Sequence, residues 1–197
     1  MTSQRTFRRL CVYCGSSNHV RPMFKEAAEE LGAIIARRGW GVVYGGGSVG
    51  LMDRVAGGAL REGGEVIGVI PEKLMGLELG RTDLTELRVV PDMHARKKTM
   101  ADLSDGFIAL PGGYGTLEEL FEAVTWTQLN YHSKPVGLLN VDGFFDSLVD
   151  FLERAVAEGF VRTVHADLVL VDSDPHRLLK RMEEARLPEL AQWIDDV

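Results

Sequence analysis

The chain has 197 residues, of which 45% are hydrophobic and 26% charged, enough for one domain with a substantial core. Its formal net charge of -7 argues against the basic surface of a general nucleic-acid or anionic-membrane binder. No apolar run is long enough to span a membrane, and the start lacks a hydrophobic targeting segment with a cleavage site. We therefore expect a cytoplasmic protein with a single domain over residues 1–197.

Seven short apolar runs predict strands. They show little polar alternation, which is typical of strands buried on both faces of a parallel sheet. In chain order they are LCVYC from Leu10, GVVY from Gly41, EVIGVI from Glu65, LRVV from Leu87, GFIAL from Gly106, PVGLL from Pro135 and LVLV from Leu168.

Helical patterns separate these strands. Apolar residues keep one face over 24–35 and again over 148–155, and glycine follows each run. Asp174 can cap a further helix that has Pro175 at its first position. Residues 71–83 are less regular, and the tail after Pro188 looks peripheral. The alternation predicts an α/β fold, a doubly wound, Rossmann-like parallel sheet of about seven strands with helices on both faces.

Cys11 and Cys14 form a C-x-x-C pair inside the first strand. Positions three apart on a strand point to opposite faces, so the pair is not arranged for a metal or a disulfide. We expect two small buried side chains.

Four motifs follow predicted strands: CGSS after the first, GGGSVG after the second, PDMHARKK after the fourth and PGGYGT after the fifth. Ligands of such sheets bind beyond the carboxyl ends of the strands, where the strand order reverses. In the order 3-2-1-4-5-6-7, strands one and four would be neighbours at that point. All four motifs would then surround one crevice.

The glycine-rich segment from Gly45 to Gly50 matches G-x-G-x-x-G. Backbone amides of such turns can bind phosphate. A dinucleotide-binding fingerprint, however, follows the first strand, whereas this one follows the second. Glycines that only permit a tight turn and close helix packing are the alternative.

The second glycine-rich loop, PGGYGT, leads into Thr116 and Glu119 at the spacing of a capping box. Leu117, Leu120, Phe121 and Val124 would form the buried stripe of the helix that follows. Glu119 would then project at the edge of the crevice, where capping and catalysis are both open to it.

Arg96, Lys97 and Lys98 fall in the first turns of the helix after the fourth strand. Cations there oppose the helix dipole at a cost of about 0.3–1 kcal/mol each, so a nearby function would explain their charge. A solvated charge run is the alternative for Lys97 and Lys98. His94 alone is more typical of a structural histidine than of a base.

MHARK from Met93 to Lys97, together with PGG-x-GT-x-x-E from Pro111 to Glu119, resembles the LONELY GUY family of cytokinin riboside 5′-monophosphate phosphoribohydrolases. The similarity extends from the first strand to about Pro175 and includes CGSS, YGGGSVGLM and GVIPE. Members have carried the label "lysine decarboxylase", which the resemblance implies would be wrong here.

The resemblance implies hydrolysis of the N-glycosidic bond of an N6-modified adenosine 5′-monophosphate, to free base and ribose 5-phosphate. Glu119 would stabilise the oxocarbenium-like ribose and orient or deprotonate water, and Arg96 would hold Glu119 or the substrate in place. Whether Arg96 also donates a proton is open. The substrate-binding residues would be Ser16, Gly46, Gly47, Met93, Lys97, Gly112, Gly113, Tyr114, Gly115 and Thr116, with the phosphate on the last loop.

The family scheme requires no metal and no organic cofactor. Its partner is a small-molecule nucleotide, and members are homodimers whose active site lies near the subunit interface. The segment containing Trp126, Leu129 and Tyr131 could form that interface or belong to the core.

Other functions remain open from the residues alone. A nucleotide-binding module without turnover would have the same loops but gain nothing from a carboxylate beside a phosphate. An NAD-dependent oxidoreductase rests only on GGGSVG. A decarboxylase using pyridoxal phosphate needs a Schiff-base lysine, and nothing marks Lys97, Lys98 or Lys134 for that role.

Overall fold

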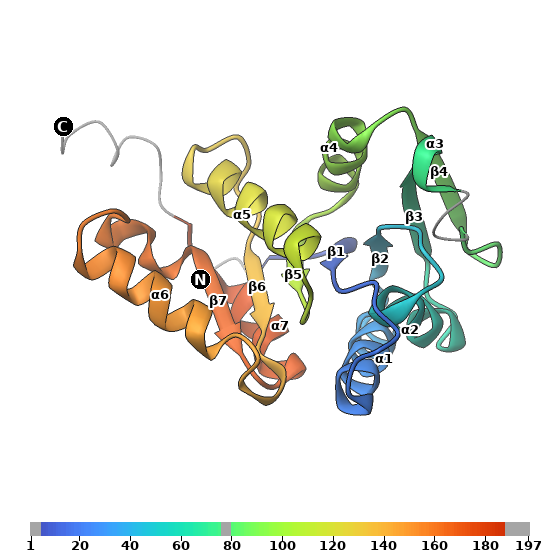
Figure 1. Cartoon of the computed structure of the whole chain (residues 1–197), viewed down its shortest axis with the longest axis horizontal. Coiled ribbons are helices and arrows are strands. Elements are labelled where there is room, and N and C mark those ends of the chain that lie inside the picture. The colour runs from blue at the N-terminus through green and yellow to red at the C-terminus, as the bar shows by residue number, and fades with distance from the viewer. Residues whose placement is uncertain (1–4, 76–79, 188–197) are drawn as a thin grey trace.

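The computed structural model describes residues 5–75 and 80–187, and within them the strands form a seven-stranded parallel sheet (Figure 1). The predicted doubly wound α/β fold is confirmed. The tail after Pro188, and residues 76–79 of the irregular segment, lie outside the described residues. The strands are β1 (Arg9–Tyr13), β2 (Gly41–Tyr44), β3 (Val66–Pro71), β4 (Glu86–Val90), β5 (Gly106–Ala109), β6 (Val136–Leu139) and β7 (Val169–Asp172).

Helices cover both faces of the sheet (Figure 1). The first face carries α1 (Pro22–Arg37), α2 (Gly50–Arg61) and α7 (Pro175–Glu184), and the second carries α4 (Met93–Leu103), α5 (Tyr114–Gln128) and α6 (Asp146–Ala157). The short elements are α3 (Glu72–Met75), η1 (Val141–Gly143) and η2 (Thr163–Leu168). In the described part of the chain, no helix combines the length and the apolar character needed to cross a membrane.

Alternate residues of β1 face the two helical layers. Leu10 and Val12 pack with α1 and α2, whereas Cys11 and Tyr13 pack with α4 and α5. Cys14 packs against the first layer, so the two cysteines lie on opposite faces, as predicted. Burial raises the pKa of both thiols, which keeps them protonated and unreactive.

The strand order is β4-β3-β2-β1-β5-β6-β7, so the prediction that the first and fourth strands are adjacent in the sheet is wrong. The described part of the β3–β4 connection contains only the four-residue α3, and strands so joined pair with each other. The strands that meet at the switch point are therefore β1 and β5. The chain returns from the edge strand through α4, which packs across β4, β3, β2 and β1.

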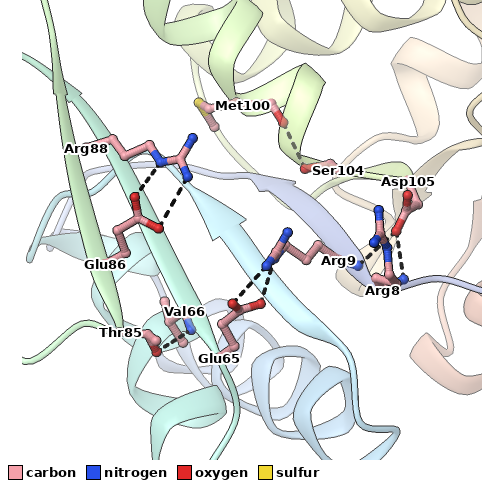
Figure 2. A network of polar contacts seen from close by, with 10 residues as sticks. All are labelled: Arg8, Arg9, Glu65, Val66, Thr85, Glu86, Arg88, Met100, Ser104 and Asp105. Atoms are coloured by element: carbon pink, nitrogen blue, oxygen red, sulfur yellow. Dashed lines mark hydrogen bonds and ion pairs between the residues drawn. The ribbon is translucent and has the colours of Figure 1, made fainter.

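An ion pair at the amino ends of the strands crosses the sheet (Figure 2). Arg9 of β1 donates to both carboxylate oxygens of Glu65, at 2.6 and 2.9 Å. A Cβ on Gly41, between them on β2, would lie 2.6 Å from Glu65 Oε2. Asp105 accepts from the backbone amides of Arg8 and Arg9 in the same region. These contacts join the strands at the end of the sheet opposite the motif-bearing loops.

Two glycines bring α1 and α2 into backbone contact. A Cβ on Gly32 would lie 2.1 Å from the carbonyl oxygen of Val55, and a Cβ on Gly58 would lie 2.0 Å from that of Glu29. Neither neighbour is a flexible side-chain end, so the helices would have to separate.

We expect Gly58→Ala to lower the free energy of unfolding by about 1–3 kcal/mol, because the added methyl overpacks the helix crossing. The melting temperature should fall by roughly 2–4 °C for each kcal/mol. Gly57→Ala is the matched control: its Cβ would have as nearest neighbours the ends of the flexible Arg61 and Arg81 side chains, both at 3.5 Å. It should leave stability unchanged or raise it by up to about 1 kcal/mol. Equal melting of the two variants would contradict the close crossing.

Candidate active site

Three of the four motif-bearing loops meet directly at the carboxyl ends of the strands. The amide of Leu110 donates to the Tyr13 carbonyl at 2.9 Å, and the amide of Gly15 donates to the Pro111 carbonyl at 3.0 Å. The amide of Leu51, at the start of α2, donates to the Gly15 carbonyl at 2.9 Å. The loop after β1 is therefore held between the loops after β2 and β5.

Close backbone approach explains the glycines of these loops. A Cβ on Gly15 would lie 3.3 Å from the Cα of Gly112. Gly50 has a φ of +61°, and its Cβ would lie 2.5 Å from the carbonyl carbon of Ser16. The side chain of Asn18 accepts from the Gly50 amide at 2.9 Å. Thus the first loop caps the helix that follows the second loop.

The amino end of α5 is open. Gly113 is its N-cap residue and supplies no side-chain cap, and the first turn holds no acidic residue. A Cβ on Gly113 or Gly115 would meet nothing within 4 Å, and Tyr114 between them is 95% exposed. The positive end of the helix dipole thus faces accessible space, which suits an anion.

The predicted capping box of Thr116 and Glu119 is wrong. Thr116 is the third residue of α5 rather than its N-cap, and its side chain is buried. A Cβ on Gly112 would lie 2.1 Å from Thr116 Oγ1, so the hydroxyl occupies the space beneath the loop. The loop therefore needs glycine at 112, and Glu119 lies in the second turn of the helix rather than at the third position of a capping box.

The buried stripe of α5 also differs from the prediction. The stripe consists of small residues and one leucine, because the helix lies close to the sheet; its members are Thr116, Leu120, Ala123 and Thr127. Leu117 and Val124 are only half-buried, and Phe121 is exposed. At 100° per residue, this rotation puts Glu119 beside the buried face, where it is half-buried.

The second glycine-rich loop is largely occupied by protein contacts. The Gly46 carbonyl accepts from the Arg81 amide at 3.2 Å, and Gly47 forms an isolated bridge with Gly80. The first amides of α2, at Gly50 and Leu51, already donate to the first loop. These contacts favour the alternative in which the glycines of GGGSVG permit a tight turn and close packing. Substrate contact by Gly46 or Gly47 stays a prediction.

Arg96 is buried at 7% exposure and reaches the second loop. Its Nη2 donates to the Gly45 carbonyl at 3.3 Å, and its Nη1 donates to Met93 Sδ at 3.7 Å. Its Nε is buried and has no hydrogen-bond partner within the described residues. A Cβ on Gly45 would lie 2.1 Å from Nη2, so Gly45 makes room for the guanidinium.

Arg96 and Glu119 act on the same thiol from two different helices. Burial raises the pKa of Cys14; the Glu119 carboxylate raises that pKa further, and the Arg96 guanidinium lowers it. The same two opposite effects act on Cys11 of β1. Both helices pack on β1, and Lys97, the neighbour of Arg96, contacts Glu118, the neighbour of Glu119. Joint action of Arg96 and Glu119 in one site stays a prediction.

Lys97 is not a solvated charge, whereas Lys98 is. Lys97 is 8% exposed, and its ammonium contacts a carboxylate oxygen of Glu118 and, at 2.7 Å, Glu122 Oε2. Burial alone would lower the pKa of Lys97, but these hydrogen bonds outweigh it and raise the pKa above its usual value. Lys98 is exposed and pairs with Asp102 one turn along α4. The Lys97 ammonium thus already has two partners, and its contact with substrate stays a prediction.

The remaining predicted residues are accessible. Ser16 is exposed, and Met93 is 41% exposed at the start of α4. Leu129 and Tyr131 are exposed, while Trp126 is half-buried beside His132. In the described ranges, no group of three or more His, Cys, Asp or Glu side chains is placed to bind a metal ion.

Sequence reasoning missed Gly45 and Asn18. Gly45 was visible only as part of a glycine run, and its specific role depends on an arginine 51 residues away. Asn18 lies in the loop after β1, and its capping of α2 joins two segments 32 residues apart. No local pattern marks either contact.

A family model described as "Possible lysine decarboxylase" matches residues 52–182. A relative from Oryza sativa subsp. japonica, named probable cytokinin riboside 5′-monophosphate phosphoribohydrolase, is 51% identical over 181 residues, 92% of this chain and 80% of its own. A cytokinin riboside 5′-monophosphate phosphoribohydrolase of Arabidopsis thaliana is 49% identical over 178 residues, 90% of this chain and 83% of its own.

Among solved structures, a molybdenum cofactor binding protein from Rippkaea orientalis is 27% identical, with a TM-score of 0.67 over 89% of this chain and 94% of that one. The sequence relatives are much closer, and they cover most of both chains. The chain therefore belongs to the family of cytokinin riboside 5′-monophosphate phosphoribohydrolases.

Proposed function

We propose that the protein hydrolyses the N-glycosidic bond of N6-modified adenosine 5′-monophosphates and releases the free base and ribose 5-phosphate. The names of relatives at 49–51% identity support this reaction. The observation that carries it is the contact of Lys97 with Glu118 and Glu122, which holds the helix of the buried Arg96 against the helix of Glu119. The open amino end of α5 lies in the same helix as Glu119.

The 5′-phosphate binds at the amino end of α5. Gly112, Gly113, Gly115 and Thr116 form this loop and first turn, and Tyr114 contacts the substrate from its exposed position. Backbone amides and the helix dipole favour a dianion there without any lysine. Ser16 and Met93 are accessible for contacts with the rest of the nucleotide.

Glu119 acts on the ribose. Cleavage of the C1′–N9 bond leaves positive charge on the ribose, and the electron pair of the bond departs with the base. Water adds to C1′, its proton passes to Glu119, and a proton from the medium reaches the base. Opposite unit charges about 4 Å apart at an effective dielectric near 20 attract by ~4 kcal/mol, which is worth roughly a thousandfold in rate.

Arg96 orients Glu119 or the substrate. The Gly45 carbonyl and Met93 Sδ hold two of its nitrogens, and the buried Nε remains for a substrate or water oxygen. Its positive charge contributes electrostatically. It stabilises negative charge that develops on the departing base.

The activity resides in a single domain over residues 1–197, in an N-glycosyl hydrolase that works as a cytoplasmic homodimer. Leu129 and Tyr131, exposed just past α5, supply apolar surface for the dimer contact. Decarboxylation is less well supported than hydrolysis, because the lysines that could form a Schiff base already have hydrogen-bond partners. Lys97 and Lys98 pair with carboxylates, and Lys134 donates to the Ala101 carbonyl at 2.7 Å.

A binding protein without turnover is the second candidate. Its support is the solved structure of a molybdenum cofactor binding protein at 27% identity. The GGGSVG loop gives less support to an oxidoreductase, since the first amides of α2 already donate to Asn18 and Gly15. Release of free base from a nucleotide distinguishes hydrolase from carrier.

Glu119→Gln should reduce hydrolysis of N6-isopentenyladenosine 5′-monophosphate by at least ~100-fold, because the amide keeps the shape but not the charge. Release of free base is the measurement. The melting temperature and the affinity for ribose 5-phosphate should stay near those of the wild type, since glutamine has the same shape and can still accept hydrogen bonds. Undiminished turnover would remove Glu119 from the mechanism.

Gly45→Ala should lower kcat by at least ~10-fold, because the added methyl moves the Arg96 guanidinium away from its position relative to the substrate. The backbone of Gly45 is not in the left-handed region, and the group in the way is the end of a flexible side chain. Stability should therefore change little, and thermal melting serves as the control. Full activity would show that the position of Arg96 has no influence on catalysis.

The nucleoside that lacks the 5′-phosphate should be a poor substrate. Each charge-assisted hydrogen bond is worth about 1.5–3 kcal/mol, so the loss of two lowers kcat/KM by roughly 100-fold or more. The measurement compares adenosine and its 5′-monophosphate, and their N6-isopentenyl counterparts. Comparable values for each pair would rule out α5 as a phosphate anchor.

A further inference from the structure

Lys97 and Glu118 are the sequence neighbours of Arg96 and Glu119. Lys97 follows Arg96 on α4, and Glu118 precedes Glu119 on α5. The Lys97 ammonium contacts Glu118 and donates to Glu122 Oε2 at 2.7 Å. The ion pairs therefore join the two helices one residue away from both candidate catalytic side chains.

The two helices otherwise rest on different parts of the sheet. α4 packs on β1, β2, β3 and β4, whereas α5 packs on β1, β5 and β6. Figure 1 shows them side by side on one face, each entering from its own loop. Both helices contact β1, and Arg96 reaches the Gly45 carbonyl at the end of the neighbouring strand β2. The separation of Arg96 and Glu119 thus depends on how α4 and α5 are spaced on the sheet.

The first turns of α5 carry a concentration of negative charge. Glu118, Glu119 and Glu122 lie within two turns, and the first and last are neighbours on the same side of the helix. Lys97 is the buried cation that two of them share. Partly buried ion pairs of this kind add little net stability but favour one geometry.

We propose that Lys97 is a positioning residue: through Glu118 and Glu122 it ties α4 to α5 and so fixes Arg96 relative to Glu119. This inference rests on the proposed hydrolase function. It replaces the predicted contact of Lys97 with substrate, and it gives Glu118 and Glu122 a defined role. A misplacement of about 1 Å can cost a hundredfold in rate, so the tie acts on kcat.

The test compares Lys97→Met with Lys98→Met in hydrolysis of N6-isopentenyladenosine 5′-monophosphate. Lys98 is the matched control: it is the next residue of α4, and its partner Asp102 is on the same helix. Lys97→Met should lower kcat by about 10-fold or more with KM changed less than about threefold, the pattern of an interaction lost in the transition state. Lys98→Met should change neither constant.

A coupled variant separates positioning from a local structural role. In Glu118→Gln/Glu122→Gln the amide oxygens still accept hydrogen bonds, but the charges that hold Lys97 are gone. Adding Lys97→Met to this background should cost less than about threefold in kcat, because the two changes act through one contact. Lys97→Arg, which can bond both carboxylates, should recover most of the wild-type kcat. These comparisons also apply if Lys97→Met alone folds poorly.

Several results would overturn the proposal. A raised KM with unchanged kcat in Lys97→Met would make Lys97 a substrate contact. An equal loss in Lys98→Met, or a full 10-fold loss from Lys97→Met in the coupled background, would show that the ion pairs with α5 are not the cause. Wild-type protein without any turnover overturns the hydrolase function as well, whereas active wild type with a fully active Lys97→Met overturns only the positioning role.

Discussion

The site depends on a buried guanidinium held by a backbone carbonyl. Arg96 is 7% exposed, and the Gly45 carbonyl accepts from its Nη2 at 3.3 Å. Desolvating a charge is costly unless the structure compensates it. Here the Gly45 carbonyl at the end of β2 and the Met93 sulfur accept from two of the three guanidinium nitrogens. Loop contacts, strand order and helix placement all serve to bring these groups together.

The two glycine-rich loops look alike in sequence, but only one of them is followed by backbone amides that are open to a ligand. The loop at Gly46 is engaged by the segment around Arg81, and the amides of the helix that follows it are capped by the first loop. The loop at Gly113 leads into a helix with no side-chain cap and with open space around it. One loop therefore builds the wall of the site, and the other presents amides to a ligand.

Much of the fold could be predicted from the sequence, because buried parallel strands and amphipathic helices leave local patterns. The pairing of β4 with β3 could not be predicted, since an apolar run does not indicate which strand lies beside it in the sheet. Thr116 and Glu119 match a capping box by spacing alone, but the N-cap residue is Gly113, three positions earlier than that pattern requires. Lys97 and Lys98 are the same residue type in one run, and only the orientation of α4 decides which is buried.

The residue type that fits at position 45 depends on the side chain at position 96. Its backbone lies outside the left-handed region, so a larger side chain is excluded there by Arg96 and Met52 rather than by conformation. Wherever evolution keeps an arginine at 96, position 45 should stay glycine. Where a shorter side chain replaces that arginine, alanine or serine becomes acceptable at 45. The two positions, 51 residues apart, should therefore co-vary among homologues and mark which of them retain the catalytic arrangement.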